Sequence, residues 1–325
     1  MKSLTKALYI ERDDHAYTPF GEIPASFKDE LIPYAHCYFY SDAEGTILDQ
    51  NIKTDGFSLW LHTINMQQGA ELHPFAQYQV IALHVSDDIP VTLSEGGHVM
   101  LRHKEVNMFN VMPVEHSAIL AEDHAISFHI NVEPAALPRL AREFPVLQPL
   151  AAMPLCMVTE ALNKVPLRLN AVGSLIKDRI LNSKHIGKTA ELFFRRNAAD
   201  YFCNFARHLS APAPIMMNQV QLRLLDDVFT YIVNNLHQAH TIQELCEKFP
   251  VNKAILQQPF EQEFHMPLAE LIHQEKMALA FDKLANTDIS ISGIMQATGY
   301  VAQEPFMADF EKYYKCDPIQ LRNAQ

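Results

Sequence analysis

The residues best suited to recognition chemistry are four glutamines in the last third of the chain. A side-chain amide both donates and accepts hydrogen bonds, and a glutamine can pair with the edge of adenine in the major groove of DNA. The candidates for base contacts are Gln257, Gln258, Gln262 and Gln303. The alternative interpretation is that these are ordinary exposed residues of helices.

Lysines close to these glutamines could neutralise phosphates, which supplies most of the affinity of proteins for DNA. The candidates are Lys253, Lys276 and Lys312, with Lys315 close behind. The charge balance opposes a strong contribution of this kind, because the chain has a formal net charge of -12. Residues 216–325 hold eight Lys/Arg against fourteen Asp/Glu, so 8 - 14 = -6. Few residues are therefore available to build the basic surface expected of a DNA-binding domain.

Histidines are the candidates for metal chemistry, since ten of the sixteen lie in the first 132 residues. A barrel enzyme with an open metal site needs a His-x-His pair, a carboxylate and a later histidine. No His-x-His occurs in these residues. His124 and His129 are five residues apart, so in a regular strand they would face opposite sides. We therefore predict no metal and no cofactor, although ligands could still converge from different strands.

A small-molecule pocket could lie among the aromatic residues of the same part of the chain. Such pockets are mostly apolar and contain a few polar groups. The candidates for ligand contacts are Trp60, which is the single tryptophan, Tyr78, His73 and His116. The alternative is that these residues simply fill the core.

The elements that would hold this pocket are strands. Residues 57–62 and 79–85 are apolar runs of strand length, and residues 125–130 alternate with period two. Residues 91–93 and 99–101 flank Ser-Glu-Gly-Gly at 94–97, which is typical of a hairpin. Several short strands separated by turns predict a small barrel or sandwich over residues 1–134.

A connector follows, with scattered prolines and then helical periodicity from residue 169 to 209. Residues 184–187 are expected to break it into two helices. Its phenylalanines could pack a dimer seam or the core of their own domain; they are Phe193, Phe194, Phe202 and Phe205. Residues 210–214, Ser-Ala-Pro-Ala-Pro, are the clearest linker.

The glutamines and lysines fall in two predicted helix-turn-helix units that are joined by one long helix. The first begins at Thr241, a good N-cap whose capping box is completed by Glu244, and turns at 249–252. The second spans residues 289–310 and turns at Gly299. A helix, a tight turn and a second helix form the unit that delivers side chains to the major groove.

These landmarks resemble the DNA-binding domain of the arabinose-regulator (AraC/XylS-type) transcription factors. The residues that carry the resemblance are 241–246, Leu256, Phe260, 288–291, Gly299, Tyr300, Phe306, Phe310, Asp317 and Pro318. Residues 179–194 are similar to the helical connector of the pyochelin-regulator-like branch of that family. The resemblance implies ligand- or partner-responsive control of transcription, often by a dimer, with a cupin-like sensing barrel in front.

The expected fold is therefore α+β and multidomain. It comprises a cupin-like sensing β-barrel (1–134), a helical connector that could serve dimerisation (135–214) and an all-α double helix-turn-helix domain that binds DNA (215–325). The first reading helix, expected over 253–264, contains Pro259, which would cost about 3 kcal/mol in a helix interior and predicts a kinked or shortened helix. Pro250 replaces the usual glycine of the first turn, and acidic Glu261 stands where the family places cations.

The sequence thus predicts a sequence-specific DNA-binding regulator that is not an enzyme. Its expected partners are double-stranded DNA, an unidentified small-molecule effector, RNA polymerase and a second copy of the chain. With no secretory leader, no membrane-spanning apolar run and five scattered cysteines, we expect a cytoplasmic protein without a membrane partner. Two alternatives stay open: an interaction protein with the same fold and degenerate DNA binding, and a metal-dependent cupin enzyme.

Overall fold

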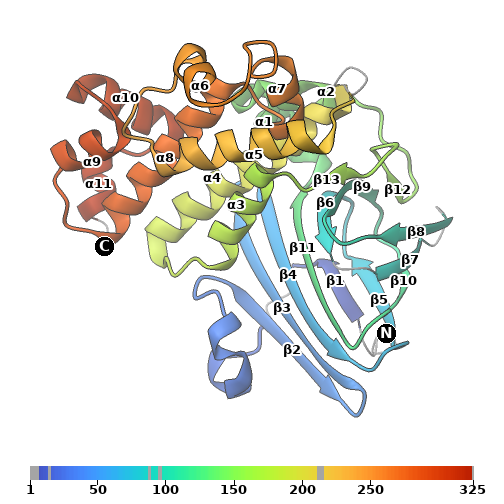
Figure 1. The fold of residues 1–325 in the computed structure, drawn as a ribbon. Helices are drawn as coiled ribbons and strands as arrows, with labels where there is room; N and C mark the ends of the chain where they lie inside the picture. Colours follow the sequence, from blue (N-terminus) through green and yellow to red (C-terminus); the bar gives the residue numbers. More distant parts are fainter. Residues whose placement is uncertain (1–6, 14–15, 87–88, 94–96, 211–215, 324–325) are drawn as a thin grey trace. The chain divides into compact units, whose positions relative to one another are not determined.

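The computed structural model describes residues 7–13, 16–86, 89–93, 97–210 and 216–323, with the backbone alone at 89–93, 97–98 and 210. The chain divides into two compact units. We call the first the sheet unit (Met1–Leu169, Ile176–Ile186, Asn197–Ser210) and the second the helical unit (Asn170–Leu175, Gly187–Arg196, Ala211–Gln325). The expected sequence of a strand-rich N-terminal part and a helical C-terminal part is confirmed (Figure 1).

Two sheets make up the sheet unit. The smaller has the strand order β1 (Ala7–Glu11), β5 (Glu71–Ala76), β10 (Ser117–Ile119), β7 (Ile89–Leu93) and β8 (Gly97–Leu101). The larger has the order β12 (Glu160–Ala161), β9 (Glu105–Val111), β6 (Val80–Ser86), β11 (His124–Val132), β4 (Phe57–Met66), β3 (Gly45–Thr54) and β2 (His36–Asp42), and β13 (Leu167–Arg168) also pairs with β9.

Alternating side chains explain how these strands enclose a core. Inward residues of both sheets pack together, among them Leu8, Ile64 and Leu72, which are 7%, 0% and 0% exposed. The hairpin predicted from residues 91–101 is confirmed, because β7 and β8 pair antiparallel; its turn at 94–96 lies outside the described residues. Strand β11 lies between β4 and β6, which brings the middle of three long strands into register.

Short helices precede and follow the strands. They are the 3-10 turns η1 (Phe20–Glu22), η2 (Ala25–Glu30), η3 (Pro134–Ala136), η4 (Pro145–Leu147) and η5 (Arg207–Ser210), with α1 (Leu137–Glu143) and α2 (Gln148–Ala151). Strands β12 and β13 join the larger sheet, so residues 135–214 are not helical throughout. The linker at 211–214 lies outside the described residues.

Two helices are divided between the units: α3 (Ala171–Leu181) and α4 (Gly187–Ala206). The predicted break at 184–187 separates them as expected. Among the connector phenylalanines, Phe194, Phe202 and Phe205 are 0% exposed within the single chain. They are therefore core residues of this chain, while dimerisation stays a prediction.

The helical unit contains α5 (Gln219–Asn234), α6 (Ile242–Lys248), α7 (Gln258–Phe264), α8 (Leu268–Asn286), α9 (Ile291–Thr298), α10 (Gln303–Tyr314) and α11 (Pro318–Asn323). Helices α6 and α7 form the first helix-turn-helix unit and α9 and α10 the second; α8 lies between them (Figure 1). Helix α8 contacts α5, α9, α10 and α11. Phe281 of α8 packs with Phe306 and Phe310 of α10, all at most 1% exposed.

Local signals set the helix ends. Thr241 and Glu244 form the predicted capping box, and Ser290 accepts a hydrogen bond from the backbone N–H of Gly293 at 3.2 Å. Gly299 ends α9 with φ +70°, in the left-handed region. An added Cβ there would lie 2.9 Å from the carbonyl oxygen of His237, so the turn requires glycine for two reasons.

The first reading helix is shortened, which is one of the two outcomes predicted from Pro259. Residues 253–257 form turns, and α7 begins at Gln258. Pro259 therefore lies in the first turn, where a missing N–H costs no helical hydrogen bond. Asn252 caps the turn ahead of α7 by accepting from the N–H of Ile255 at 3.1 Å.

Among the described residues, no helix combines the length and the apolar character needed to cross a membrane.

Candidate functional site

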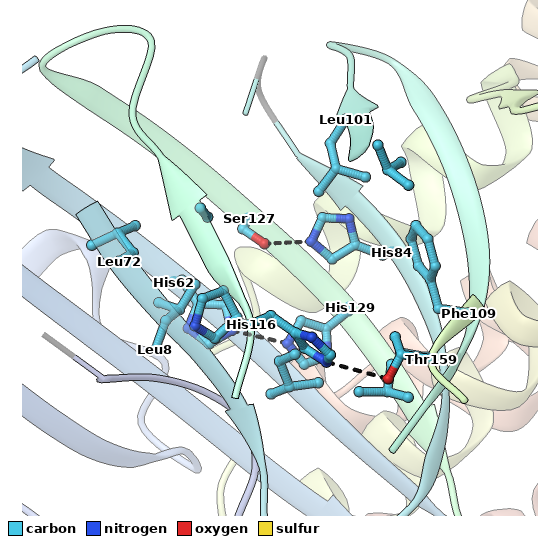
Figure 2. A pocket seen from close by; sticks show the side chains of 16 residues that line it. Leu8, His62, Leu72, His84, Leu101, Phe109, His116, Ser127, His129 and Thr159 are labelled. Atoms are coloured by element: carbon cyan, nitrogen blue, oxygen red, sulfur yellow. Dashed lines mark hydrogen bonds between the residues drawn. The ribbon is translucent and has the colours of Figure 1, made fainter. Parts of the chain in front are cut away.

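A cavity of about 80 Å³ lies in the sheet unit (Figure 2). This space exceeds the roughly 10–15 Å³ that one water molecule needs. Ten of its sixteen lining residues are apolar, including Leu8, Leu72, Leu101 and Phe109. Both sheets contribute: β1, β5, β8 and β10 on one side, and β4, β6, β9 and β11 on the other.

Six polar residues complete the lining: His62, His84, His116, Ser127, His129 and Thr159. Register brings three of the histidines together. His129 of β11 is opposite His84 of β6 on one side and Trp60 of β4 on the other, and His62 lies two residues beyond Trp60 on the same face of β4. The His62 and His129 rings stack at 5.1 Å between centroids, and those of His84 and His129 at 5.8 Å.

A buried chain of short contacts runs through two of these rings. His62 Nδ1 lies 2.7 Å from Asp49 Oδ1, and His62 Nε2 lies 2.9 Å from His129 Nε2. His129 Nδ1 lies 2.8 Å from Asn131 Oδ1. The Asn131 amide nitrogen donates to two other oxygens, at 2.7 and 3.0 Å, which fixes the direction of its carbonyl group.

The number of hydrogen-bond donors needed along Asp49, His62, His129 and Asn131 limits the protonation states of these groups. Asp49 at one end and the Asn131 carbonyl at the other are acceptors, so three contacts need three donors, whereas two neutral imidazoles supply two. The extra proton resides on one of the two rings or on the Asp49 oxygen that faces His62. Where it does not reside on His129, that ring is neutral. Burial lowers the pKa of His129 well below its ordinary value, which agrees with a neutral ring.

His84 and His116 line the cavity outside this chain. His84 Nε2 lies 2.8 Å from Ser127 Oγ, while its buried Nδ1 has no hydrogen-bond partner among the described residues. Burial, with a smaller effect of His62, lowers the pKa of His84 to about 3. His116 Nε2 lies 3.3 Å from Thr159 Oγ1, and burial also lowers its pKa. Both rings are therefore neutral at pH 7.

Of the four residues predicted to contact a ligand, His116 lines this cavity. Trp60 is fully buried and is not among the lining residues; its indole stacks on His62 and donates to Ser58 Oγ at 3.0 Å. Tyr78 packs beside the cluster of Val80 and Phe109.

His73 pairs with Glu115, with Nδ1 and Oε1 3.1 Å apart. The structure therefore does not bring the four residues together. The residues that the sequence analysis missed are His62, His84, Ser127, His129 and Thr159. Three of them offered a signal, since His62, His84 and His129 each lie in one of the three predicted strands.

Among the described residues, no group of three or more His, Cys, Asp or Glu side chains is arranged to hold a metal ion.

The first candidate reading surface is the N-terminal end of α7. Gln258 is its first residue and Gln257 its N-cap, and both are exposed. Gln262 is half-buried one turn later, and Lys253 is exposed in the turn before the helix. The N-terminal residues of a recognition helix are those that contact base edges. The positions of Gln257 and Gln258 suit that role better than that of Gln262.

The second candidate surface is α10. Gln303 is exposed as its first residue, and Lys312 is exposed in its last turn. Lys276 of α8 differs, because it is half-buried, its Nζ lies 5.8 Å from the centroid of the Tyr300 ring, and burial lowers its pKa. Its position supports the turn of the second unit.

Both reading helices begin unfavourably for phosphate. Glu261 and Glu304 lie in their first turns, where the partial positive charge of the helix would otherwise attract an anion. Pro259 and Pro305 lie in the same turns and lack the backbone N–H that would bind a phosphate oxygen.

A protein-family model described as "Helix-turn-helix domain" matches residues 245–324, from the middle of α6 to the end of α11. The chain is 25% identical over 149 residues to the xylose operon regulatory protein of Haemophilus influenzae, covering 44% of this chain and 34% of that protein. It is 27% identical over 101 residues to the regulatory protein SoxS of Escherichia coli, covering 31% of this chain and 94% of SoxS.

Among solved structures, ToxT from Vibrio cholerae aligns over 83% of this chain and 98% of its own, with 10% identity and a TM-score of 0.32. The match to the xylose regulator spans about a third of that relative's length.

Proposed function

We propose that the whole protein is a sequence-specific DNA-binding regulator of transcription that responds to a small ligand, on the premise that its C-terminal part is a helix-turn-helix domain of the AraC/XylS type. The observation that carries the proposal is the pair of helix-turn-helix units in one compact unit, each with an exposed glutamine opening its second helix. The role is one of binding, without catalysis by this chain.

The proposed site on DNA follows from the geometry of the fold. Two reading helices enter successive stretches of the major groove of double-stranded DNA, and Gln257, Gln258 and Gln303 contact base edges. Gln262 lies further along α7 and supports them. Lys253 and Lys312 contact phosphate, while Lys276 holds the second turn in place.

The proposed control comes from the sheet unit. A ligand in its cavity changes the affinity for DNA if it binds one conformation of the protein better than another, or if it changes dimerisation. A homodimer would bind two DNA half-sites about one helical turn apart. Contact with RNA polymerase would then change the rate of transcription when the protein is bound to DNA.

The rival function is an interaction protein that keeps the fold but has lost DNA affinity. The formal charge of -6 over residues 216–325, with Glu261 and Glu304 at the reading helices, favours it specifically. Carboxylates facing phosphates repel them, and no counterion release would compensate.

Selection of bound fragments from a random DNA pool by full-length protein, at low and near-physiological salt, tests the proposal. Enrichment of one motif with two half-sites is the expected result. Binding that ignores DNA sequence at both salt concentrations would support the interaction protein instead.

Alanine variants of the reading glutamines sharpen the test. Gln258→Ala or Gln303→Ala should cost about 1–3 kcal/mol of binding free energy and relax the preference at one base position. Gln320→Ala is the matched control, because Gln320 is exposed on α11, outside both helix-turn-helix units. A uniform loss on all sequences would assign the glutamines to phosphate contacts.

A further inference from the structure

We propose that the cavity of the sheet unit binds a small, uncharged, mainly apolar molecule that carries one hydrogen-bonding group, a hydroxyl or an amide, next to Ser127 and His84. The inference deepens the ligand-responsive part of the proposed function and rests on it for its biological meaning. The binding itself is a property of the sheet unit alone.

The size and lining of the cavity select an apolar body. Ten apolar side chains from both sheets line the cavity of about 80 Å³, so a compact hydrocarbon framework in it would lose most of its contact with water. Leu8, Leu72 and Leu101 surround the polar groups in Figure 2.

The electrostatics of the cavity exclude an ion. Its described lining contains no Lys, Arg, Asp or Glu. Asp49 and His62 are satisfied by their own contacts, and burial lowers the pKa of His84 and of His129, which favours neutral rings. A buried carboxylate or ammonium group without an opposite charge is strongly disfavoured. A charged ligand would therefore have to bring its own counterion or protonate a ring that burial holds neutral.

The hydrogen-bonding capacity of the cavity is concentrated at one place. Ser127 Oγ has one donor and two acceptor sites but a single contact among the described residues, with His84. His84 Nδ1 is unpaired among the same residues, and whether it donates or accepts depends on the direction of the Ser127 hydroxyl hydrogen. A ligand group that both donates and accepts fits either arrangement.

The same capacity disfavours a sugar. All four ring nitrogens of His62 and His129 already have partners within the protein. A molecule with a hydroxyl on nearly every carbon would leave most of these groups unpaired against apolar walls, and each unpaired polar group is penalised.

Three probes with one ring and different substituents test the proposal with full-length protein and no DNA. Cyclohexanol, cyclohexanecarboxylate and methylcyclohexane are titrated at pH 7 by calorimetry and by the emission of Trp60, the single tryptophan, which stacks on His62 and His129. Cyclohexanol should bind about tenfold or more tightly than the carboxylate, because the buried ion lacks a partner. Equal or tighter binding of the carboxylate overturns the proposal, as does failure of both uncharged probes to bind up to their solubility limits.

Variants locate the contact. Ser127→Ala should weaken cyclohexanol about five- to tenfold, the range of one hydrogen bond, and leave methylcyclohexane unchanged. Equal cyclohexanol affinity in this variant overturns the assigned hydrogen bond. Ile126→Ala is the matched control, since Ile126 is the preceding residue of β11 and is 40% exposed.

A second variant guards against misfolding of the first. Val99→Phe adds bulk to a half-buried cavity residue and should abolish binding of both uncharged probes; unchanged affinity would place the probes elsewhere and overturn the proposal. DNA selection is a separate measurement. Probe binding without a DNA motif would refute the proposed function alone, and a DNA motif without probe binding would refute the ligand class alone.

Discussion

The sheet unit holds its candidate recognition groups inside, and the helical unit holds them outside. Asp49, His62 and His129 are at most 3% exposed and bond to one another, whereas Gln258 and Gln303 are exposed at the starts of two helices. Recognition inside a sheet structure depends on which strands meet, whereas recognition by a helix end depends on a few consecutive residues. The two units should therefore respond differently to the same kinds of change.

The largest difference is expected for loss of a polar side chain. His62→Leu leaves a buried Asp49 and a buried His129 nitrogen without their partner, and should cost the sheet unit about 3 kcal/mol of stability. Urea unfolding followed by Trp60 emission measures this unit alone, because it contains the single tryptophan. The control is His124→Leu, where an exposed ring contacts Asn65; it should change stability by about 0.5 kcal/mol or less. Equal effects of the two variants on stability would contradict the assignment of His62 to a buried hydrogen-bonded site.

The next largest difference between the two units is expected in their loss of stability at acid pH. Burial lowers the pKa of His84, His116 and His129, so the unfolded chain binds more protons than the folded chain below about pH 6.5. Stability of the sheet unit is therefore lost as pH falls from about 6.5 towards the folded-state values, by up to about 1.4 kcal/mol per pH unit for each histidine. Glu11, whose pKa burial raises, opposes part of this loss.

The same urea titration at pH 7 and 5.5 checks this prediction. The Trp60 transition should shift more than the helical transition at 222 nm, since burial lowers the pKa of three histidines of the sheet unit and, in the helical unit, that of the less buried His240. His84→Phe should reduce the shift. A Trp60 transition that ignores pH would refute the neutral-ring assignment.

A turn substitution is expected to have a smaller effect, in the helical unit. Gly299→Ala combines a left-handed φ of +70° with a Cβ 2.9 Å from a carbonyl oxygen, and should cost about 1–2 kcal/mol, read from the melting temperature at 222 nm. Gly69→Ala is the matched control in the sheet unit: its φ is +83°, but a Cβ would meet nothing within 4 Å. A larger loss at Gly69 would show that the close approach at Gly299 is unimportant.

The smallest effect is expected at Pro259. Because this proline lies in the first turn of α7, Pro259→Leu should change stability by about 0.5 kcal/mol or less in the same melting experiment. A gain of about 2 kcal/mol or more would instead indicate a strained helix interior.

The same contrast explains what the sequence could predict. Thr241 and Gly299 could be predicted from the sequence, because capping and tight turns involve residues three or four positions apart. Pro259 predicted a kinked or a shortened first reading helix but not which of the two; in the structure the helix begins at Gln258 and the proline lies in its first turn. A small-molecule cavity in the strand-rich part was predicted, but of the four residues predicted to line it only His116 does so. His62 and His129 are 67 positions apart, and only the pairing of β4 with β11 brings them together.

The division of helix α4 between the two units limits where this chain can be recombined with another. Its first half belongs to the helical unit, where the Phe193 ring lies 5.8 Å from that of Phe281 and Arg196 lies over the Tyr313 ring at 3.4 Å. Its second half belongs to the sheet unit, and the helix is continuous between them. A gene fusion or recombination event at the proline-rich residues 210–214 would join a new partner to a reading unit that lacks one of its own packing surfaces. A helical unit transferred with all of its packing surfaces must therefore include residues that precede the linker, from Asn170–Leu175 and Gly187–Arg196.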